Sequence, residues 1–234
     1  MIFDPMWLLY AAPGLLLGLW AQAKVRSAYS RASQIPSRRR LTGADTAHAI
    51  LEAEGVRDVG VEPTHGFLSD HYHPLEKKLR LSESNYASDS LAAVGVAAHE
   101  VGHALQHARG YLPLMMRSAL VPLTQIGSWI AQLALLGGLF LMYSAPHLGK
   151  TFLFWAILGY AAVFLFTLVT VPVEYNASKR ALAVIADRGI VTADEIPEVK
   201  RVLDAAALTY VAGLVSALGM LLYAVHLFGR ASDD

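Results

Sequence analysis

Four stretches of the chain contain no Asp, Glu, Lys or Arg, and they constrain the fold more than any other feature. They cover residues 5–23, 118–149, 151–173 and 205–229. About 20 apolar residues in an α-helix, rising about 1.5 Å per residue, span the hydrocarbon core of a bilayer. The sequence therefore predicts four transmembrane helices, near residues 6–23, 119–143, 152–173 and 206–228.

The composition agrees with a membrane protein, since 55% of the residues are hydrophobic and only 16% are charged. The first apolar stretch follows the acidic sequence "MIFDP". A cleaved signal peptide has a basic N-terminal region, so an uncleaved anchor fits better. A buried helix of a soluble protein is the alternative interpretation of residues 5–23.

The distribution of Lys and Arg predicts the orientation of the chain in the membrane. Segment 24–117 carries 12 of these residues and segment 174–204 carries 5, whereas the remaining two are Lys150 and Arg230. Four spans put the two basic segments on the same side, which the positive-inside rule identifies as cytoplasmic. We therefore expect a multi-pass membrane protein with its basic segments on the cytoplasmic face and both termini outside.

Residues 41–113 show the pattern of a small α/β unit. Residues 42–55 read as a capped helix, 56–63 as a strand, 66–82 as a hairpin with a turn around Pro74, and 87–110 as a helix that ends at Gly110. The predicted fold is a mainly α integral membrane protein with about four transmembrane helices and a small cytoplasmic α/β unit. The predicted segments are a transmembrane helix at 1–24, the cytoplasmic α/β unit at 25–117, two transmembrane helices at 118–173, a cytoplasmic helical segment at 174–204 and a transmembrane helix at 205–234.

The stretch "AAHEVGHALQH", residues 97–107, contains the pattern H-E-x-x-H on a predicted helix. Positions four apart lie on one helix face, so His99 and His103 can both direct an imidazole at one ion. Glu100 can then take a proton from a metal-bound water, as in zinc metalloproteases. The alternative is an ordinary polar helix face.

A metal site here needs a third ligand, and the chain has no Cys that could supply a thiolate. The extended pattern H-E-x-x-H-x-x-G-x-x-H is excluded, because Gln106 and Arg109 occupy the positions of its Gly and last His. Glu174 is the first charged residue after the third predicted span, on the same side of the membrane, and it completes a common His2Glu site. His107 and Asp204 are the alternative ligands.

The sequence also offers candidates that would assist the reaction. The stretch "DHYH" contains His71, Tyr72 and His73 just before the motif helix, and any of them could stabilise a transition-state oxyanion. Asp204 could accept a hydrogen bond from a ligand histidine. The strand "KKLRLS", residues 77–82, could pair with an extended substrate, although an ordinary amphipathic strand explains it equally well.

The chain resembles the YugP-type family of small membrane zinc metallopeptidases. The resemblance covers nearly the whole chain and rests on blocks that occur in the same order, namely "LSDHYHP", "LRLSE", "GVAAHEVGHALQH", "VPVEYNASKRAL" and "VLDAAALTYVA". It implies a gluzincin-like peptidase with His99, His103 and Glu174 as zinc ligands and Glu100 as catalytic base. It also implies that the cytoplasmic α/β unit is a zincin-like metallopeptidase unit and that the protein lies in a bacterial inner membrane. Members of the family often have Asp two residues after the ligand Glu, whereas this chain has Asn176, which implies a weaker orienting group for a ligand histidine.

The sequence therefore predicts a zinc metalloendopeptidase that binds one Zn²⁺ per chain and cleaves membrane or membrane-proximal proteins. Its expected partners are the lipid bilayer, a protein or peptide substrate, and a membrane protein or a second copy of the chain. A net charge of zero gives no indication of nucleic acid binding. Two alternatives stay open: an inactive membrane scaffold with a structural zinc site, and an intramembrane metalloprotease of the site-2 type, for which Asp204 in "VLDAA" would be a ligand.

Overall fold

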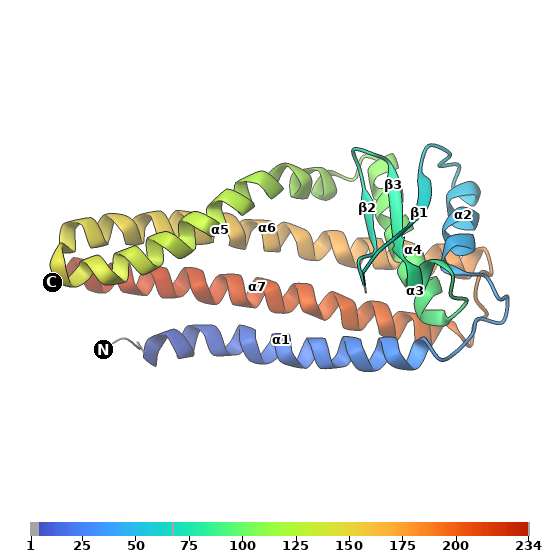
Figure 1. Ribbon diagram of the computed structural model, residues 1–234, viewed down its shortest axis with the longest axis horizontal. Helices are drawn as coiled ribbons and strands as arrows, with labels where there is room; N and C mark the ends of the chain where they lie inside the picture. Colours follow the sequence, from blue (N-terminus) through green and yellow to red (C-terminus); the bar gives the residue numbers. More distant parts are fainter. Residues whose placement is uncertain (1–4, 67, 234) are drawn as a thin grey trace. The chain divides into compact units, whose positions relative to one another are not determined.

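The structure, a computed structural model, describes residues 5–66 and 68–233 and is mainly helical (Figure 1). Residues 1–4 of the predicted first segment and Asp234 of the last lie outside this description. The elements in chain order are α1 (Pro5–Ala32), α2 (Gly43–Ala53), β1 (Gly60–Thr64), β2 (His71–His73), β3 (Lys78–Ser82), α3 (Glu83–Tyr86), α4 (Leu91–Ala108), α5 (Leu112–Ser144), α6 (Pro146–Asp187) and α7 (Ile196–Asp233).

Four of the described helices, α1, α5, α6 and α7, are long and apolar enough to cross a membrane, as the sequence predicts. All four extend beyond the predicted spans. α1 continues to Ala32, although the sequence analysis gives no helix beyond residue 24, and α6 continues to Asp187. Residues 21–32 contain neither Gly nor Pro, so nothing in them interrupts a helix.

The chain divides into two compact units. One contains α1 up to Trp20, residues Met116–Val171 and the chain from Thr209, and the other contains Ala21–Met115 and Pro172–Leu208. We call them the helical unit and the mixed unit. The mixed unit therefore combines two parts of the sequence that are separated by α5 and most of α6.

The helical unit presents large apolar side chains to its surroundings. On α5, Trp129, Leu133, Leu136 and Phe140 are each more than 60% exposed. Soluble monomeric proteins rarely expose so much contiguous apolar surface, whereas lipid would cover it. Inside the unit, Gly159 of α6 packs against the backbone of Gly127 of α5, which lets the two helices approach closely.

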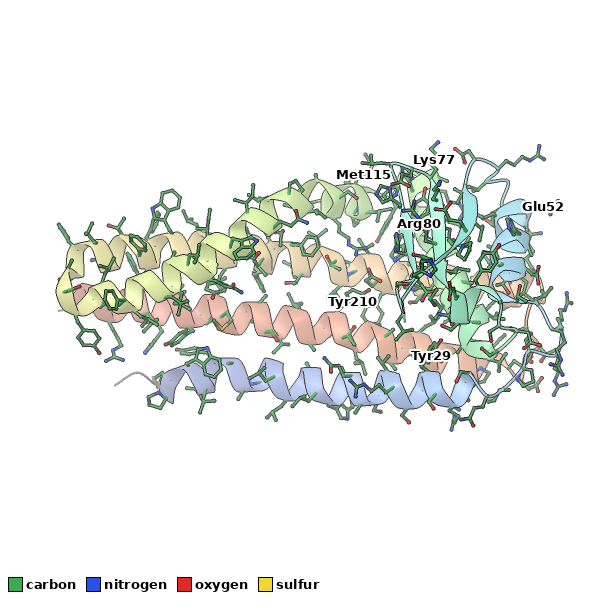
Figure 2. The ribbon with its side chains drawn as sticks, in the orientation of Figure 1. Tyr29, Glu52, Lys77, Arg80, Met115 and Tyr210 are labelled. Carbon is green, nitrogen blue, oxygen red and sulfur yellow. The ribbon has the colours of Figure 1, made fainter. Side chains whose placement is uncertain are left out.

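The mixed unit contains a three-stranded sheet in the order β1-β3-β2. β2 and β3 form the predicted antiparallel hairpin, and β1 pairs with β3 in parallel. Arg80 of β3 forms ion pairs with Glu62 of β1 and Glu76 of the hairpin turn (Figure 2). Since β3 is the central strand and is paired on both sides, the prediction that it could pair with a substrate is wrong.

The core of the mixed unit lies between the sheet and its helices, with α4 next to the sheet (Figure 1). Leu79 and Leu81 of β3 are fully buried, and they belong to the same cluster as Val94 and Val101 of α4. Alanine residues fill much of the remaining core, so the backbones of the packed elements approach closely. α4 is consequently a rigid, almost wholly buried support for the residues it carries.

α2 packs on the same cluster through one face, while Glu52 is exposed on another (Figure 2). The helix begins with the predicted Thr cap. Thr42 accepts a hydrogen bond from the backbone of Asp45, and the Asp45 carboxylate accepts one from the backbone of Thr42. This reciprocal pair satisfies backbone donors that a helix start otherwise leaves free.

Candidate metal centre

The two histidines of the H-E-x-x-H pattern lie on α4, which has clear start and stop signals. The Ser90 hydroxyl caps the helix by accepting a hydrogen bond from the backbone N–H of Ala93. Gly110 follows the helix with a φ of 61°, a conformation that favours glycine. Within the helix, the rings of His99 and His103 stand edge to face with centroids 4.8 Å apart.

Glu174 of α6 meets both imidazoles. Its Oε2 atom lies 3.1 Å from His99 Nε2 and 3.5 Å from His103 Nε2. The Glu174 side chain is only 1% exposed. Three potential ligand atoms from two helices therefore lie within 4.8 Å of one another. Among the described residues, His99, His103 and Glu174 form a group that could hold a metal ion.

This arrangement fits a zinc ion. Zinc binds histidine nitrogen and carboxylate oxygen at about 2.1 Å, so the ligand atoms of a tetrahedral site lie about 3.4 Å apart. The observed separations of 3.1 and 3.5 Å from the Glu174 oxygen agree with that requirement. The donor set of two imidazoles and one carboxylate is that of catalytic zinc sites, which keep a further position for water.

A glycine explains how α4 and α6 come close enough to share the site. A Cβ atom added to Gly102 would lie 2.5 Å from the backbone oxygen of Ala177 on α6. No real side chain tolerates that distance, so only glycine fits here. Gly102 precedes His103, and Ala177 lies one turn after Glu174, so this contact brings the ligands of the two helices together.

Glu100 lies next to the first histidine and is 9% exposed. Burial raises the pKa of its carboxyl to about 7, while the nearby His99 lowers it and the carboxylates of Glu174 and Asp70 raise it further. A carboxyl group with a pKa near neutrality can both accept and return a proton at physiological pH. The structure thus gives Glu100 the environment that a general base requires.

The three candidates on β2 lie in different surroundings. In the exposed ring of His71, the Nδ1 atom is 2.8 Å from the backbone oxygen of Ser69. A charge on this ring would lower the pKa of Glu100. The Tyr72 hydroxyl is 2.8 Å from His107 Nδ1, and burial raises the pKa of Tyr72 to about 12. His73 accepts a hydrogen bond from the backbone of Glu76 within the hairpin turn.

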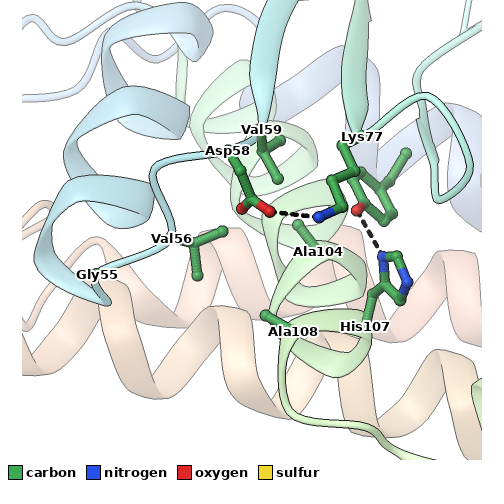
Figure 3. Close-up of a pocket in the computed structure, with 9 residues that line it drawn as sticks. Gly55, Val56, Asp58, Val59, Lys77, Ala104, His107 and Ala108 are labelled. Atoms are coloured by element: carbon green, nitrogen blue, oxygen red, sulfur yellow. Dashed lines mark hydrogen bonds and ion pairs between the residues drawn. The ribbon is translucent and has the colours of Figure 1, made fainter.

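Tyr72 and His107 face a cavity of about 390 Å³ beside the C-terminal half of α4 (Figure 3). An ion pair between Asp58 and Lys77 lies at the same cavity. Its lining residues are Gly55, Val56, Asp58, Val59, Tyr72, Lys77, Ala104, His107 and Ala108. His107 therefore bonds Tyr72, whereas His99 and His103 both contact Glu174.

Asn176 and Asp204 form their described interactions with residues other than His99 and His103. The Asn176 side-chain oxygen accepts hydrogen bonds from Gln106 and Arg180. Asp204 is exposed and forms an ion pair with Lys200, one turn earlier on α7. Within the described part of the chain, neither side chain has a hydrogen bond or ion pair with His99 or His103.

Two other residues occupy the orienting positions that the sequence analysis assigned to Asn176 and Asp204. Ser178 Oγ is 3.1 Å from His99 Nδ1, and Gln106 Oε1 is 3.0 Å from His103 Nδ1. Helical spacing could have identified both residues, since Gln106 follows His103 by three positions and Ser178 follows Glu174 by four. Residues at these spacings lie on the same face of a helix.

Comparisons with known proteins agree with a zinc site in a membrane protein. A family model described as "Putative neutral zinc metallopeptidase" matches residues 7–229. The chain is also 42% identical over 218 residues to a Bacillus subtilis (strain 168) protein named "Putative membrane protease YugP", which covers 93% of this chain and 94% of that protein. No solved structure gives a significant match.

Proposed function

The chain belongs to the family described as "Putative neutral zinc metallopeptidase", and we propose that it is an integral-membrane zinc endopeptidase of the gluzincin type. The observation that carries this proposal is the convergence of His99, His103 and Glu174 beside a buried Glu100. Of the described residues, only α1, α5, α6 and α7 form helices suited to crossing a membrane, which makes the chain a membrane protein.

In the proposed reaction His99, His103 and Glu174 hold one zinc ion. A zinc ion held there would supply Lewis acidity and would lower the pKa of a coordinated water to about 7. Glu100 takes the proton of the attacking water and returns it to the leaving amine, for which a carboxyl pKa of about 7 is well suited. The burial of the Glu100 side chain would limit the contact of its carboxyl group with bulk water during both steps.

Of the three β2 candidates, we assign the stabilisation of the oxyanion to His71. A charge on His71 would lower the pKa of Glu100, whereas the Tyr72 hydroxyl is hydrogen-bonded to His107 and His73 belongs to the hairpin turn. The hydrogen bond to Ser69 O requires a proton on His71 Nδ1, because a carbonyl oxygen only accepts. His71 would therefore have to be doubly protonated, or turn its ring, to donate a hydrogen bond to an oxyanion.

The proposed substrates are membrane or membrane-proximal proteins, cleaved at the cytoplasmic face. The basic residues support this orientation, since 17 of 19 belong to the segments 24–117 and 174–204 that carry the site. Both termini would then lie outside. α4 has 18 residues and is not one of the described helices that are long and apolar enough to cross a membrane. This favours cleavage in water over cleavage inside the bilayer.

The substitution Glu100→Gln tests the function. Amide and carboxylate have nearly the same shape, so the variant should bind one zinc per chain by elemental analysis while losing hydrolysis of fluorescein-labelled casein in detergent. Glu52→Gln, at an exposed position of α2, is the control and should keep both properties. Full hydrolysis by Glu100→Gln would contradict the catalytic assignment. Wild-type protein that binds zinc but cleaves nothing would favour the scaffold with a structural zinc site.

A further inference from the structure

Gln106 connects the two helices of the candidate metal centre. It lies on α4 and is completely buried. Its Oε1 atom is 3.0 Å from His103 Nδ1, and its Nε2 atom donates hydrogen bonds to Val173 O, at 2.8 Å, and to Asn176 Oδ1, at 3.0 Å. Val173 is the residue immediately before Glu174, so the amide of Gln106 links one ligand residue to the backbone that positions another.

The direction of these hydrogen bonds is fixed by Arg180. Its Nε atom donates to Asn176 Oδ1 at 2.7 Å. A guanidinium group can only donate hydrogen bonds, so the Asn176 atom that faces it must be the oxygen. Val173 O is also an acceptor. The end of the Gln106 amide that faces α6 must therefore be its NH₂ group, and its carbonyl oxygen must face His103.

A carbonyl oxygen facing His103 Nδ1 determines which ring nitrogen carries the proton. The oxygen only accepts, so Nδ1 carries the hydrogen and the neutral ring keeps its lone pair on Nε2. This Nε2 atom lies 3.5 Å from Glu174 Oε2, which is itself electron-rich. A cation between the two atoms would turn this repulsion into attraction.

The other ligand histidine lacks such control. His99 Nδ1 faces the hydroxyl of Ser178, which can donate or accept a hydrogen bond. Ser178 is therefore compatible with either tautomer of His99. Of the two pairs, only the one between Gln106 and His103 selects a tautomer.

We propose that Gln106 is a positioning residue that holds His103 in its Nδ1–H tautomer, so that Nε2 is available to a metal, and that Arg180 sets the direction of this network through Asn176. The inference rests on the proposed zinc site. Asn176 would then influence the metal indirectly, through its hydrogen bond with Gln106. The sequence had suggested that Asn176 orients a histidine directly.

Gln106→Met, which keeps the length of the side chain and removes both polar atoms, tests the proposal in the full-length protein in detergent. Groups that orient a metal-ligating histidine typically change metal affinity about 10–100-fold. We expect zinc affinity, measured by competition with a chelator, to fall by about that factor, and the visible spectrum of the Co²⁺-substituted protein to change. Gln34→Leu, at an exposed position after α1, is the control and should change neither quantity.

Two substitutions of Asn176 separate positioning from packing. Asn176→Asp keeps an oxygen for both donors and should bind zinc within about threefold of wild type, whereas Asn176→Ala removes the oxygen and should weaken binding, though less than Gln106→Met does. Asn176 is partly exposed, so these variants remain informative if Gln106→Met does not fold. Wild-type zinc affinity and an unchanged Co²⁺ spectrum in both Gln106→Met and Asn176→Ala would overturn the proposal.

A measurement without metal keeps this test independent of the proposed function. NMR of ¹⁵N-labelled histidine reports the tautomer of His103 in the metal-free protein, at a pH above the imidazole pKa. We expect the Nδ1–H form in wild type and a shift toward the Nε2–H form in Gln106→Met. The Nε2–H form in wild type would refute the role of Gln106, whereas the Nδ1–H form in a protein that binds no zinc would refute only the proposed function.

Discussion

Gly102 of α4 lies against the backbone of Ala177 of α6, so closely that an added Cβ atom would sit 2.5 Å from the Ala177 oxygen. At Gly95, two turns earlier on the same helix, an added Cβ atom would instead meet the side chain of Val199 at 2.9 Å. A side-chain methyl group can move more easily than a backbone carbonyl that is fixed in a helix. The two glycines therefore form a matched pair.

Gly102→Ala should push α4 away from α6 and weaken the metal site. Overpacking of this kind typically costs about 1–3 kcal/mol, and we expect lower thermal stability together with weaker zinc binding. Gly95→Ala should have a smaller effect, since the helix propensity of Ala offsets part of the strain. Thermal denaturation and chelator competition would check both variants. A Gly102→Ala protein with unchanged zinc affinity would show that the close contact does not position the ligands.

Removal of zinc should destabilise the protein by mass action. A ligand that binds only the folded state at about 100 times its dissociation constant stabilises that state by about 2.7 kcal/mol. We therefore expect a chelator to lower the melting temperature of wild type. Glu174→Ala should lack this response, because it loses a ligand, whereas Glu52→Gln should keep it. A chelator response of wild-type size in Glu174→Ala would place the third ligand elsewhere.

Tyr72→Phe should affect stability more than catalysis. The Tyr72 hydroxyl bonds His107, and a pKa of about 12 keeps it protonated. Loss of one such hydrogen bond costs about 1 kcal/mol, and we expect casein hydrolysis to stay within about twofold of wild type. His71→Ala should lower the rate by about 10²-fold or more, as removal of an oxyanion donor does. The opposite ranking of the two variants would reassign the oxyanion role to Tyr72.

Glu195, in the connection between α6 and α7, should contribute stability that depends on pH. Burial alone would raise its pKa, but hydrogen bonds from Thr192 and from the backbone of Arg38 outweigh burial, and the net effect is a lowered pKa. A carboxyl group whose pKa is lower in the folded state stabilises the protein above the unfolded pKa of about 4.3. That stability is lost as the pH falls through the folded pKa.

Glu195→Gln should therefore lose about 1–3 kcal/mol at neutral pH, where the charged acceptor is missing. The difference between wild type and variant should shrink as the pH falls below about 4. Denaturation followed by circular dichroism across this pH range would measure it, with Glu52→Gln as the exposed control. A difference that does not change with pH would mean that the charge of Glu195 contributes nothing.

Local patterns in the sequence identify much of this fold. The caps at Thr42 and Ser90 begin α2 and α4, the hairpin forms around Pro74, and the spacing of His99 and His103 places both imidazoles on one helix face. The length of α1 was underestimated, because charge ends a transmembrane span but does not end a helix.

Features that depend on distant parts of the chain were harder to predict. The parallel pairing of β1 with β3 makes β3 a central strand, and no local pattern reveals that choice. Ser178 reaches His99 only across the contact between α4 and α6, whereas the spacing of Gln106 from His103 on α4 was a local signal that the sequence analysis did not use. Glu174 was proposed from its position after the third span, and only the structure shows its carboxylate beside both imidazoles.

The order of the ligands along the chain has a consequence for biosynthesis. His103 precedes Glu174 by 71 residues, and α5 and most of α6 lie between them. A ribosome that adds about 5–20 residues per second needs roughly 4–14 seconds for this interval. During that time the nascent chain contains His99, Glu100 and His103 but not yet Glu174, whose carboxylate completes the proposed metal site. With the proposed function, the chain would become competent to cut only after its third apolar helix has been made, and an unfinished chain would not cut the translocation machinery.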